Sequence, residues 1–445
     1  MASTLRPAVS RGRTWAAIVL ALAGGCDDAA PGASEPAAPA AAAARGEEAP
    51  PEPPEEAAGA DGRGEDAGSA TLASPEMSRV RLGAAHGCAL GEDDRLRCWG
   101  SNRFGQLGRS NLARGPGAHA AEASPVPGLG AVAAVAAGAF HTCALGRSGR
   151  VRCFGHGGHG LLGETAAGGE EGGEDVPAPR EVAGVDGATA VAAGEGFTCA
   201  VVHGGMVVCW GRNDHGQLGR GERGPPGAPA PVRGLDGVVG LAAGRQHACA
   251  RRADGAVWCW GMTVDGQMGA AASGEVAAVP VRVGFPEPAV EVAAGGYHTC
   301  ARFASGEVRC VGSNDSGQLG TGGGGAPEDR QRAPVAMNGV MDAASLAAGA
   351  RFTCVRRRGG TVACAGYNGH GQLGDGTTTL RKRAVPVKGL RGATALAAGA
   401  SHACAALAAG GVACWGRDAD GRLGAGTESD RSAPPALAVP LDGSQ

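Results

Sequence analysis

Short runs of apolar residues recur in pairs along residues 77–445. Residues 191–202 and 206–210 form one such pair and meet at His203-Gly204-Gly205. The alternation of side chains within each run has the period of a β-strand. The equivalent turn position holds glycine in six copies and Asp94 in the first. Both residue types tolerate the positive φ of a tight turn, so each pair of runs is predicted to form a β-hairpin.

Both faces of the predicted hairpin are mostly apolar. The residue after the first cysteine of each copy is alanine six times and Val355 once, and the residue two before the second cysteine is valine six times and Leu96 once. On the opposite face, the residue after the second cysteine is Trp99, Trp210, Trp260, Trp415, Phe154, Val311 or Ala365. A sheet with two apolar faces is typical of a blade packed between neighbouring blades.

The hairpin belongs to a unit that repeats seven times. In each copy 26 residues recur without an insertion, followed by 24 to 30 residues of looser sequence. A glycine lies five residues before each first cysteine, another lies two after each second cysteine, and each unit closes with Gly-Gln-Leu-Gly or a variant of it. A strict period of about 53 residues indicates a repeat architecture rather than two or three separate domains.

Fourteen of the 15 cysteines form seven pairs with a separation of ten residues. That separation places the two cysteines opposite each other on the hairpin, where Cβ atoms lie about 4.5–5.5 Å apart and can approach disulfide distance. One disulfide per hairpin is therefore predicted. The predicted pairs are Cys88–Cys98, Cys143–Cys153, Cys199–Cys209, Cys249–Cys259, Cys300–Cys310, Cys354–Cys364 and Cys404–Cys414.

A histidine two residues before the first cysteine is the other candidate for chemistry in the repeat. Seven zinc sites would require it as a ligand, but two copies have Phe197 and Phe352 at this position. Because an apolar ring serves equally well, the histidine is interpreted as a packing residue with a hydrogen-bonding tip, and no metal site is expected. The five histidines are His86, His141, His247, His298 and His402.

The composition agrees with a turn-rich β protein. The chain has 82 glycines and only 15 Phe, Trp and Tyr residues among 445. Each glycine inside a helix costs roughly 1 kcal/mol relative to alanine, which disfavours a helical protein, and the glycines lack the three-residue period of collagen. Residues 77–445 carry a net charge of only +4 and contain just two lysines. They lack the concentrated basic footprint of a nucleic-acid-binding protein.

Residues 1–26 are predicted to be an export signal. Three arginines precede the apolar run from Trp15 to Ala23, and Gly24-Gly25-Cys26 follows. The apolar run is shorter than the roughly 20 residues of a membrane span. The small residues before Cys26 resemble the lipobox of bacterial lipoproteins, although Ala23 stands where that family more often has leucine. The resemblance implies cleavage before Cys26 and lipid attachment to it. Ordinary secretion is the alternative.

Residues 27–76 are predicted to be a disordered tether. They contain eight prolines and twelve acidic residues against two arginines, and hold almost nothing that could form a core. A flexible coil of this length would span about 40 Å, and proline and charge repulsion would extend it. The tether would hold the domain at residues 77–445 clear of a membrane surface.

The repeat Ala-Ala-Gly-x-x-His-Thr-Cys-Ala-Leu, then Gly-x-Val-x-Cys-Trp-Gly, then Gly-Gln-Leu-Gly, resembles that of the regulator of chromosome condensation family. The resemblance covers residues 77–445 and implies an all-β fold, a seven-bladed β-propeller of four-stranded antiparallel blades. The first unit begins at Arg79–Leu82, without the Pro-Val segment that precedes later units, as at Pro231-Val232. The tail Pro435–Leu441 is predicted to supply that strand and join the two ends.

Family membership determines the fold better than the function. Members include a nuclear exchange factor for a GTPase, light receptors, ubiquitin-ligase modules and secreted inhibitors of β-lactamase, and the exchange-factor residues cannot be carried over to this chain. The repeats show no nucleophile–base pair, phosphate loop or carboxylate pair, so neither an enzyme nor a cofactor is expected. Nucleotide exchange and an envelope hydrolase activity are the alternatives.

The leading hypothesis is an exported, lipid-anchored binding scaffold at the bacterial cell envelope. We expect a monomer whose partner is an envelope or extracellular protein, or a glycan, and not a nucleic acid. The variable segments after each Gly-Gln-Leu-Gly should gather on one face of the ring and bind that partner. Candidate residues on these segments are Arg109, Arg114, His119, the acidic cluster Glu170 to Asp175, Arg330 and Arg332.

Overall fold

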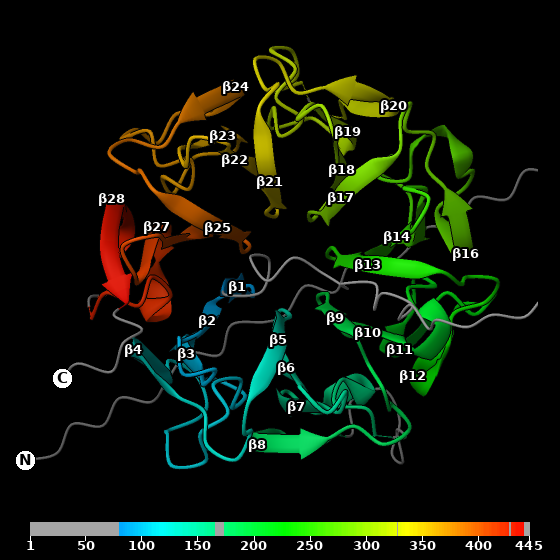
Figure 1. The fold of residues 1–445 in the computed structure, drawn as a ribbon, viewed down its shortest axis with the longest axis vertical. Coiled ribbons are helices and arrows are strands. Elements are labelled where there is room, and N and C mark those ends of the chain that lie inside the picture. Colours follow the sequence, from blue (N-terminus) through cyan, green and yellow to red (C-terminus); the bar gives the residue numbers. More distant parts are fainter. Residues whose placement is uncertain (1–79, 165–172, 327, 427–428, 440–445) are drawn as a thin grey trace, which may run out of the picture. The chain divides into compact units, whose positions relative to one another are not determined.

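Seven four-stranded sheets surround a central axis (Figure 1). The structure is a computed structural model that describes residues 80–164, 173–326, 328–426 and, for the backbone, 429–439. Every sheet is antiparallel, and its four strands are consecutive in the sequence. The predicted seven-bladed β-propeller is therefore confirmed. The export signal at 1–26 with Cys26, and the tether at 27–76, lie outside the described residues.

In each blade the first strand lies nearest the axis and the fourth lies outermost (Figure 1). The first blade contains β1 (Val80–Leu82), β2 (His86–Leu90), β3 (Leu96–Ser101) and β4 (His119–Pro125). The other blades are β5 (Val132–Ala137), β6 (His141–Gly146), β7 (Val151–Gly155) and β8 (Val176–Glu181); β9 (Ala190–Ala193), β10 (Phe197–Val202), β11 (Met206–Asn213) and β12 (Gly224–Pro231); β13 (Val238–Ala243), β14 (His247–Arg252), β15 (Val257–Met262) and β16 (Val276–Arg282); β17 (Ala289–Ala294), β18 (His298–Phe303), β19 (Val308–Ser313) and β20 (Arg330–Ala336); β21 (Ala343–Ala348), β22 (Phe352–Arg357), β23 (Val362–Gly366) and β24 (Arg381–Pro386); β25 (Ala393–Ala398), β26 (His402–Leu407), β27 (Val412–Asp418) and β28 (Ser429–Val439).

The second and third strands of each blade form the predicted hairpin. Its two cysteines face each other directly in the register, as Cys88 faces Cys98. All seven predicted pairs are at disulfide distance, with Sγ–Sγ separations of 2.03–2.12 Å. The turn residue has positive φ in every blade, with Asp94 at 55° and the six equivalent glycines between 71° and 92°. The local spacing of the sequence thus determined the hairpin.

The hydrophobic core is divided into seven clusters, each between two adjacent blades. In one of them Cys88 and Cys98 of the first blade pack with Phe154 of the second. The apolar residues after the second cysteine, including all four tryptophans at this position, are fully buried. Each blade therefore buries both faces, as the pattern of apolar residues predicted.

A ring of seven glycines surrounds the axis where the first strands end. A Cβ atom on Gly138 would lie 2.4 Å from Cε1 of His141 in the same blade and 2.7 Å from the carbonyl oxygen of Gly194 in the next. A Cβ on Gly399 in the last blade would lie 2.4 Å from the carbonyl oxygen of Gly83 in the first. Only glycine allows the blades to approach so closely, and the same contact closes the ring.

The predicted splice of the two chain ends is wrong. The tail strand β28 pairs with β27 of the last blade and not with a strand of the first. Likewise, the segment that ends at Pro231 is the fourth strand of the blade before it, since β12 pairs with β11. The first unit therefore lacks no strand. The ring closes by packing of β1 against β25 and β26 instead.

The helical segments of the described chain are single turns of 3₁₀ helix, such as Gly158–Gly160 and His203–Gly205. Among these residues, no helix has the length and hydropathy of a membrane span.

Candidate binding face

The loops after the first and third strands of each blade emerge at the same end of the ring, because neighbouring strands are antiparallel. We call this end the loop face. It comprises the first loops at 83–85, 138–140, 194–196, 244–246, 295–297, 349–351 and 399–401, and the described parts of the second loops at 102–118, 156–175, 214–223, 263–275, 314–329, 367–380 and 419–428.

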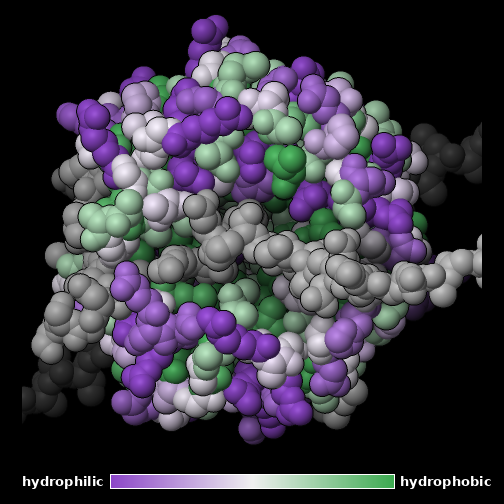
Figure 2. Space-filling model, in the orientation of Figure 1, coloured by the Kyte–Doolittle hydropathy of each residue, from purple (hydrophilic) through white to green (hydrophobic). Residues whose placement is uncertain are grey.

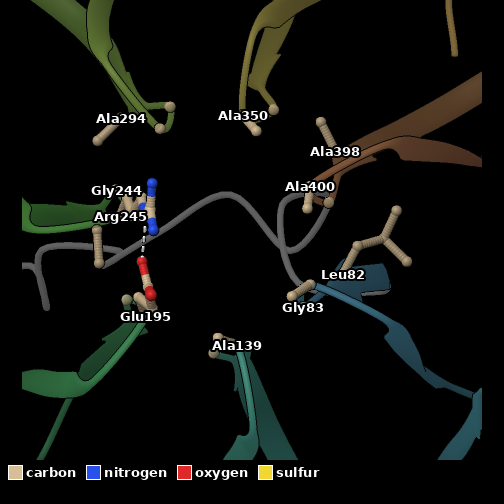
Figure 3. A pocket seen from close by; sticks show the side chains of 18 of the residues that line it. Leu82, Gly83, Ala139, Glu195, Gly244, Arg245, Ala294, Ala350, Ala398 and Ala400 are labelled. Carbon is tan, nitrogen blue, oxygen red and sulfur yellow. Dashed lines mark hydrogen bonds and ion pairs between the residues drawn. The ribbon is translucent and has the colours of Figure 1, made fainter. Parts of the chain in front are cut away.

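A cavity of about 330 Å³ lies on the axis at the loop face, and we call it the axial pocket. Alanine and glycine residues of the first loops form most of its lining, and its larger side chains are Leu82, Phe140, Glu195, Arg245 and Tyr297. Figure 3 shows Glu195 and Arg245 pointing toward each other from adjacent blades. Figures 1 and 2 view the ring from the side opposite to Figure 3, and the space-filling view of that other side shows hydrophobic residues around the centre and mainly hydrophilic residues toward the rim. A mainly apolar hollow with a few polar groups is typical of a binding site.

Charged and aromatic side chains of four successive blades are linked beside this pocket. Arg245 donates hydrogen bonds to the Glu195 carboxylate and to the Tyr297 hydroxyl. The guanidinium carbons of Arg245 and Arg351 lie 5.6 Å and 5.4 Å from the centroid of the Tyr297 ring. Arg351 also forms an ion pair of 3.5 Å with Asp315. The hydrogen bond to Glu195 raises the pKa of Arg245. The network holds both guanidinium groups next to an aromatic ring.

An aromatic cluster lies on the loop face over the first two blades. Phe104 contacts Phe140 and His156, with ring centroids 5.4 Å and 4.6 Å apart. The Arg103 guanidinium carbon lies 5.1 Å from the centroid of Phe104. His156 is held by the Asp175 carboxylate at 2.9 Å from its Nδ1. The Phe140 side chain remains partly exposed, at 39%.

Aromatic residues are scarce in this chain, so their location is informative. Eight Phe and Trp side chains are fully buried in the blades. By contrast, Phe104, Phe140, Tyr297 and Tyr367 all lie in loops of the loop face, and Phe140 and Tyr367 are 39% and 40% exposed. Exposed aromatic and arginine side chains are enriched in the centres of protein interfaces. The loop face therefore has the composition of a protein-binding surface.

The predicted binding residues are spread over the outer part of this face. Arg109 folds back on its own blade, with Nη2 3.5 Å from the Cys98 carbonyl oxygen. Arg114 is exposed, and exposed His119 begins β4 with Nδ1 2.8 Å from the Gly117 carbonyl oxygen. The contacts seen for Arg109 and His119 are thus with main-chain oxygens of their own blade.

The remaining predicted residues fall in two other blades. Asp175 contacts His156 and so supports the aromatic cluster. Glu170 lies outside the described residues. Arg330 and Arg332 are exposed in the outer strand β20, and Arg330 lies 3.9 Å from Asp265 of the neighbouring blade. Among the predicted residues that the structure describes, Asp175 thus contacts the aromatic cluster through His156.

The sequence interpretation missed the first loops. In the repeat Ala-Gly-x-x-His, the two variable positions hold Ala139-Phe140, Glu195-Gly196, Arg245-Gln246, Gly296-Tyr297 and Ala350-Arg351 in successive blades. These positions vary in size and charge although their neighbours are nearly constant. That contrast was the available signal, since variable residues on a constant scaffold are where binding specificity resides.

The histidines of the repeat link adjacent blades. In four blades the histidine Nε2 lies 2.7–2.9 Å from a threonine Oγ1 of the next blade, in the pairs His86–Thr142, His141–Thr198, His247–Thr299 and His298–Thr353. Burial lowers the pKa of His86 and His247 to about 3 and of His141 and His298 to about 4. In the part of the chain that the structure describes, no three potential ligands form a metal-binding group.

A closed ring of seven four-stranded antiparallel blades defines a seven-bladed β-propeller. The profile of the Regulator of chromosome condensation (RCC1) repeat matches residues 93–145, 204–251 and 254–302. A second profile of the same repeat matches 78–106, 132–161, 188–217, 238–267, 289–318 and 343–372. Together they cover more than half of the chain, which therefore belongs to the regulator of chromosome condensation repeat family.

Similar proteins extend this result. The mitochondrial RCC1 domain-containing protein RUG3 of Arabidopsis thaliana is 32% identical over 32% of this chain and 31% of its own length. The ultraviolet-B receptor UVR8 of the same plant is 32% identical over the same shares. The match thus spans about a third of the length of each of these two relatives.

Two solved structures share the fold. Yeast RCC1 (Prp20), solved bound to Kap60, has a TM-score of 0.67 at 20% identity, over 84% of this chain and 89% of that one. Human WBSCR16 has a TM-score of 0.64 at 21% identity, over 74% and 86%.

Proposed function

We propose that this protein is an exported, lipid-anchored scaffold that binds a protein partner at the cell envelope through its loop face. The observation that carries the proposal is the placement of Phe104, Phe140, Tyr297 and Arg351 in and beside the axial pocket of a closed ring. Such residues dominate binding energy when they are desolvated at the centre of an interface. A glycan is a weaker candidate, because the exposed face also carries the ion pairs of Glu195 and Asp315 with arginine.

Seven cysteine pairs at disulfide distance support export. Disulfides persist in oxidising compartments and are rare in the cytosol of most organisms. The arginine-led apolar segment before Cys26 gives the chain a route to such a compartment, and lipid attached to Cys26 would hold it at a membrane. Mass spectrometry of the mature N-terminus tests this step. A mature chain that begins elsewhere than Cys26, or lacks lipid, would leave the protein secreted but unanchored.

Solved structures of similar fold support protein binding in a general way. Yeast RCC1 was solved bound to Kap60, and Prp20p of Saccharomyces cerevisiae has been described with its binding properties to Gsp1p and histones. Export would separate this chain from nuclear partners and from GTPases, so nucleotide exchange is the second candidate. A nucleotide-release assay with purified GTPases separates exchange from scaffolding, and a hydrolase screen tests the enzymatic alternative.

Affinity capture from the native envelope is the direct test. The intact protein serves as bait beside a variant with Phe104→Ala and Phe140→Ala, and a second with Tyr297→Ala and Arg351→Ala. We expect a specific partner to be captured, with each double variant weakening its binding at least about thirtyfold, as hot-spot losses of 2 kcal/mol or more imply.

A control variant on the opposite end of the ring sharpens this test. Met341 is 65% exposed in the loop between β20 and β21, so Met341→Ala should leave capture unchanged. A partner that loses binding to Met341→Ala, but keeps it to both loop-face variants, would place the docking surface on the opposite end.

A further inference from the structure

A second cavity, of about 230 Å³, lies on the axis behind the axial pocket, and we call it the inner chamber. The two cavities share one ring of wall residues, Leu82, Ala137, Ala193, Ala243, Ala294, Ala348 and Ala398. They are therefore consecutive parts of the central channel. Six of the seven shared residues are alanine, so the wall between the two cavities is formed by small side chains.

Two charged residues of the first strands interrupt the mainly apolar wall of the inner chamber. Two positions before the ring glycine, six blades have alanine and the first has Arg81. At the position four residues before the ring glycine, the fifth blade has Glu291. The second, third, fourth, sixth and seventh blades have alanine, glycine or serine there. Both charged residues line the inner chamber. They are departures from the repeat that the packing of blades does not require.

Arg81 has few partners for a partly buried guanidinium. Its one hydrogen bond within the described chain runs from Nη1 to its own neighbour, the Val80 carbonyl oxygen, at 3.1 Å, and it forms no ion pair with any described carboxylate. A guanidinium carries five N–H donors and costs free energy when it is buried without acceptors. Burial lowers the pKa of Arg81, and the more distant Glu291 carboxylate raises it.

Glu291 is already occupied by other partners. Its Oε2 accepts a hydrogen bond from Arg302 Nε at 2.8 Å, and its Oε1 accepts one from the Leu346 N–H at 3.3 Å. Its side chain is only 6% exposed. The charge of Glu291 is thus balanced by Arg302, which leaves the charge of Arg81 without a direct counterpart.

A second arginine adds to the positive charge of the chamber. Arg356 lines it and donates from Nε to Ser345 Oγ at 3.2 Å. The first strand of each blade also pairs on one side only, so its other edge offers main-chain N–H groups to the channel. The inner chamber therefore combines two guanidinium groups with main-chain donors, while its one carboxylate is already paired.

We propose that the inner chamber is a binding site for a small oxyanion, a carboxylate or phosphate group held by Arg81 and Arg356. The planar fork of a guanidinium matches the two oxygens of either group, and such charge-assisted hydrogen bonds are about twice as strong as neutral ones. Much of the chamber wall is apolar alanine, and the attraction between opposite charges is stronger beside apolar groups than in bulk water. The site is separate from the loop-face partner proposed above and does not depend on it.

Calorimetry with the full-length protein tests the proposal, with inorganic phosphate and acetate as separate probes at low ionic strength. We expect at least one probe to bind and Arg81→Ala to weaken it at least tenfold. Arg81→Ala introduces the residue that the other six blades have, so the fold should be retained. Arg95→Ala is the matched control, because Arg95 lies in an exposed hairpin turn with its side chain 72% exposed, and should bind as the unaltered protein does.

A second variant distinguishes an anion site from a cation site. Glu291→Gln keeps the shape of the side chain and removes its negative charge, so oxyanion binding should become several-fold tighter. Weaker oxyanion binding in Glu291→Gln would overturn the proposal. Equal binding by Arg81→Ala and the unaltered protein, or no binding of either probe to a folded protein, would also overturn it. Stronger binding of phosphate than of acetate would assign the site to phosphate groups, and the reverse to carboxylates.

Discussion

The indole Nε1 of Trp99 in the first blade donates a hydrogen bond of 3.0 Å to the carbonyl oxygen of Arg422 in the last, 323 residues away in the chain. Trp210, Trp260 and Trp415 make the same bond to the preceding blade, at 2.9–3.0 Å. The contact between the first and last blades therefore uses the same hydrogen bond as the contacts between blades that follow each other in the chain. The chain does not run directly from the last blade to the first, so loss of this hydrogen bond should destabilise the closed ring.

Trp99→Phe should destabilise the protein by about 1–3 kcal/mol, because it leaves the buried Arg422 carbonyl without its indole donor. Phenylalanine fits this position, since the second blade has Phe154 there. Denaturant unfolding measures the change. Trp258→Phe is the control: the Trp258 indole nitrogen has no hydrogen-bond partner among the described residues, so this variant should cost less. Equal losses of stability in Trp99→Phe and Trp258→Phe would show that the missing hydrogen bond does not cause the destabilisation.

Gly138→Ala should destabilise the ring by more than about 2 kcal/mol, because the added Cβ would clash with His141 and with the Gly194 carbonyl of the next blade. Gly284→Ala provides the comparison, since a Cβ there meets no atom within 4 Å, and should change stability by less than about 0.5 kcal/mol. Thermal unfolding of the two variants measures the difference. Similar melting temperatures would contradict the close approach of blades at the glycine ring.

His402→Phe should stabilise the closing junction by roughly 1 kcal/mol. His402 is fully buried, and neither ring nitrogen has a hydrogen-bond partner among the described residues. Where a threonine would face it, the first blade has Gly87. Replacement of an unsatisfied buried polar ring by an apolar one removes a desolvation cost. The matched variant His86→Phe breaks the bond to Thr142 and should destabilise instead. A loss of stability in both variants would contradict this account.

Acid should destabilise the ring between about pH 6.5 and pH 3. The native pKa of His247 is about 3, because burial disfavours the charged imidazolium, and an unfolded histidine has a pKa near 6.5. The unfolded state therefore binds more protons in this window, so stability is complete above pH 6.5 and falls as the pH drops. Each such histidine contributes up to about 1.4 kcal/mol per pH unit.

A double variant isolates the histidine contribution to this acid sensitivity. His247→Phe with Thr299→Ala reproduces the pairing of Phe197 with Ala248 that the neighbouring blades already use. We expect near-normal stability at pH 7.5 and a smaller fall in melting temperature between pH 6.5 and pH 4. An unchanged pH dependence would assign the acid sensitivity to other groups.

Alanine at both Cys354 and Cys364 should lower stability by about 2–3 kcal/mol, the model-dependent value for closing a loop of this length. The variant isolates one of seven similar pairs, so the other blades serve as internal references. Peptide mapping without reductant should recover seven links with a ten-residue separation in the unaltered protein. Free thiols throughout, or links between blades, would contradict the pairing.

Features that depend on short-range spacing could be predicted from the sequence. A ten-residue separation across a tight turn places Cys143 opposite Cys153 whatever the rest of the fold does. The repeat count then determined the number of blades, because each unit contributes one sheet. The packing role of His141 also followed from the sequence, since Phe197 replaces it in the next copy.

The assignment of the outer strand failed for a physical reason. A linear repeat does not show which of its segments share a sheet, and hydrogen bonding placed the segment that ends at Pro231 in the blade before it. The same ambiguity led to the wrong prediction for the tail, which belongs to the last blade.

The sequence by itself therefore determined the hairpins, the cysteine pairs and the seven blades, because each rests on contacts within about 26 residues. Only the tertiary structure decided what gathers at the axis. Arg245 of the fourth blade meets Tyr297 of the fifth through the packing of neighbouring blades. Arg81 of the first blade and Glu291 of the fifth line the same chamber only because the ring closes. Closure is a property of all seven units at once, so no local pattern in the sequence could show which side chains would meet there.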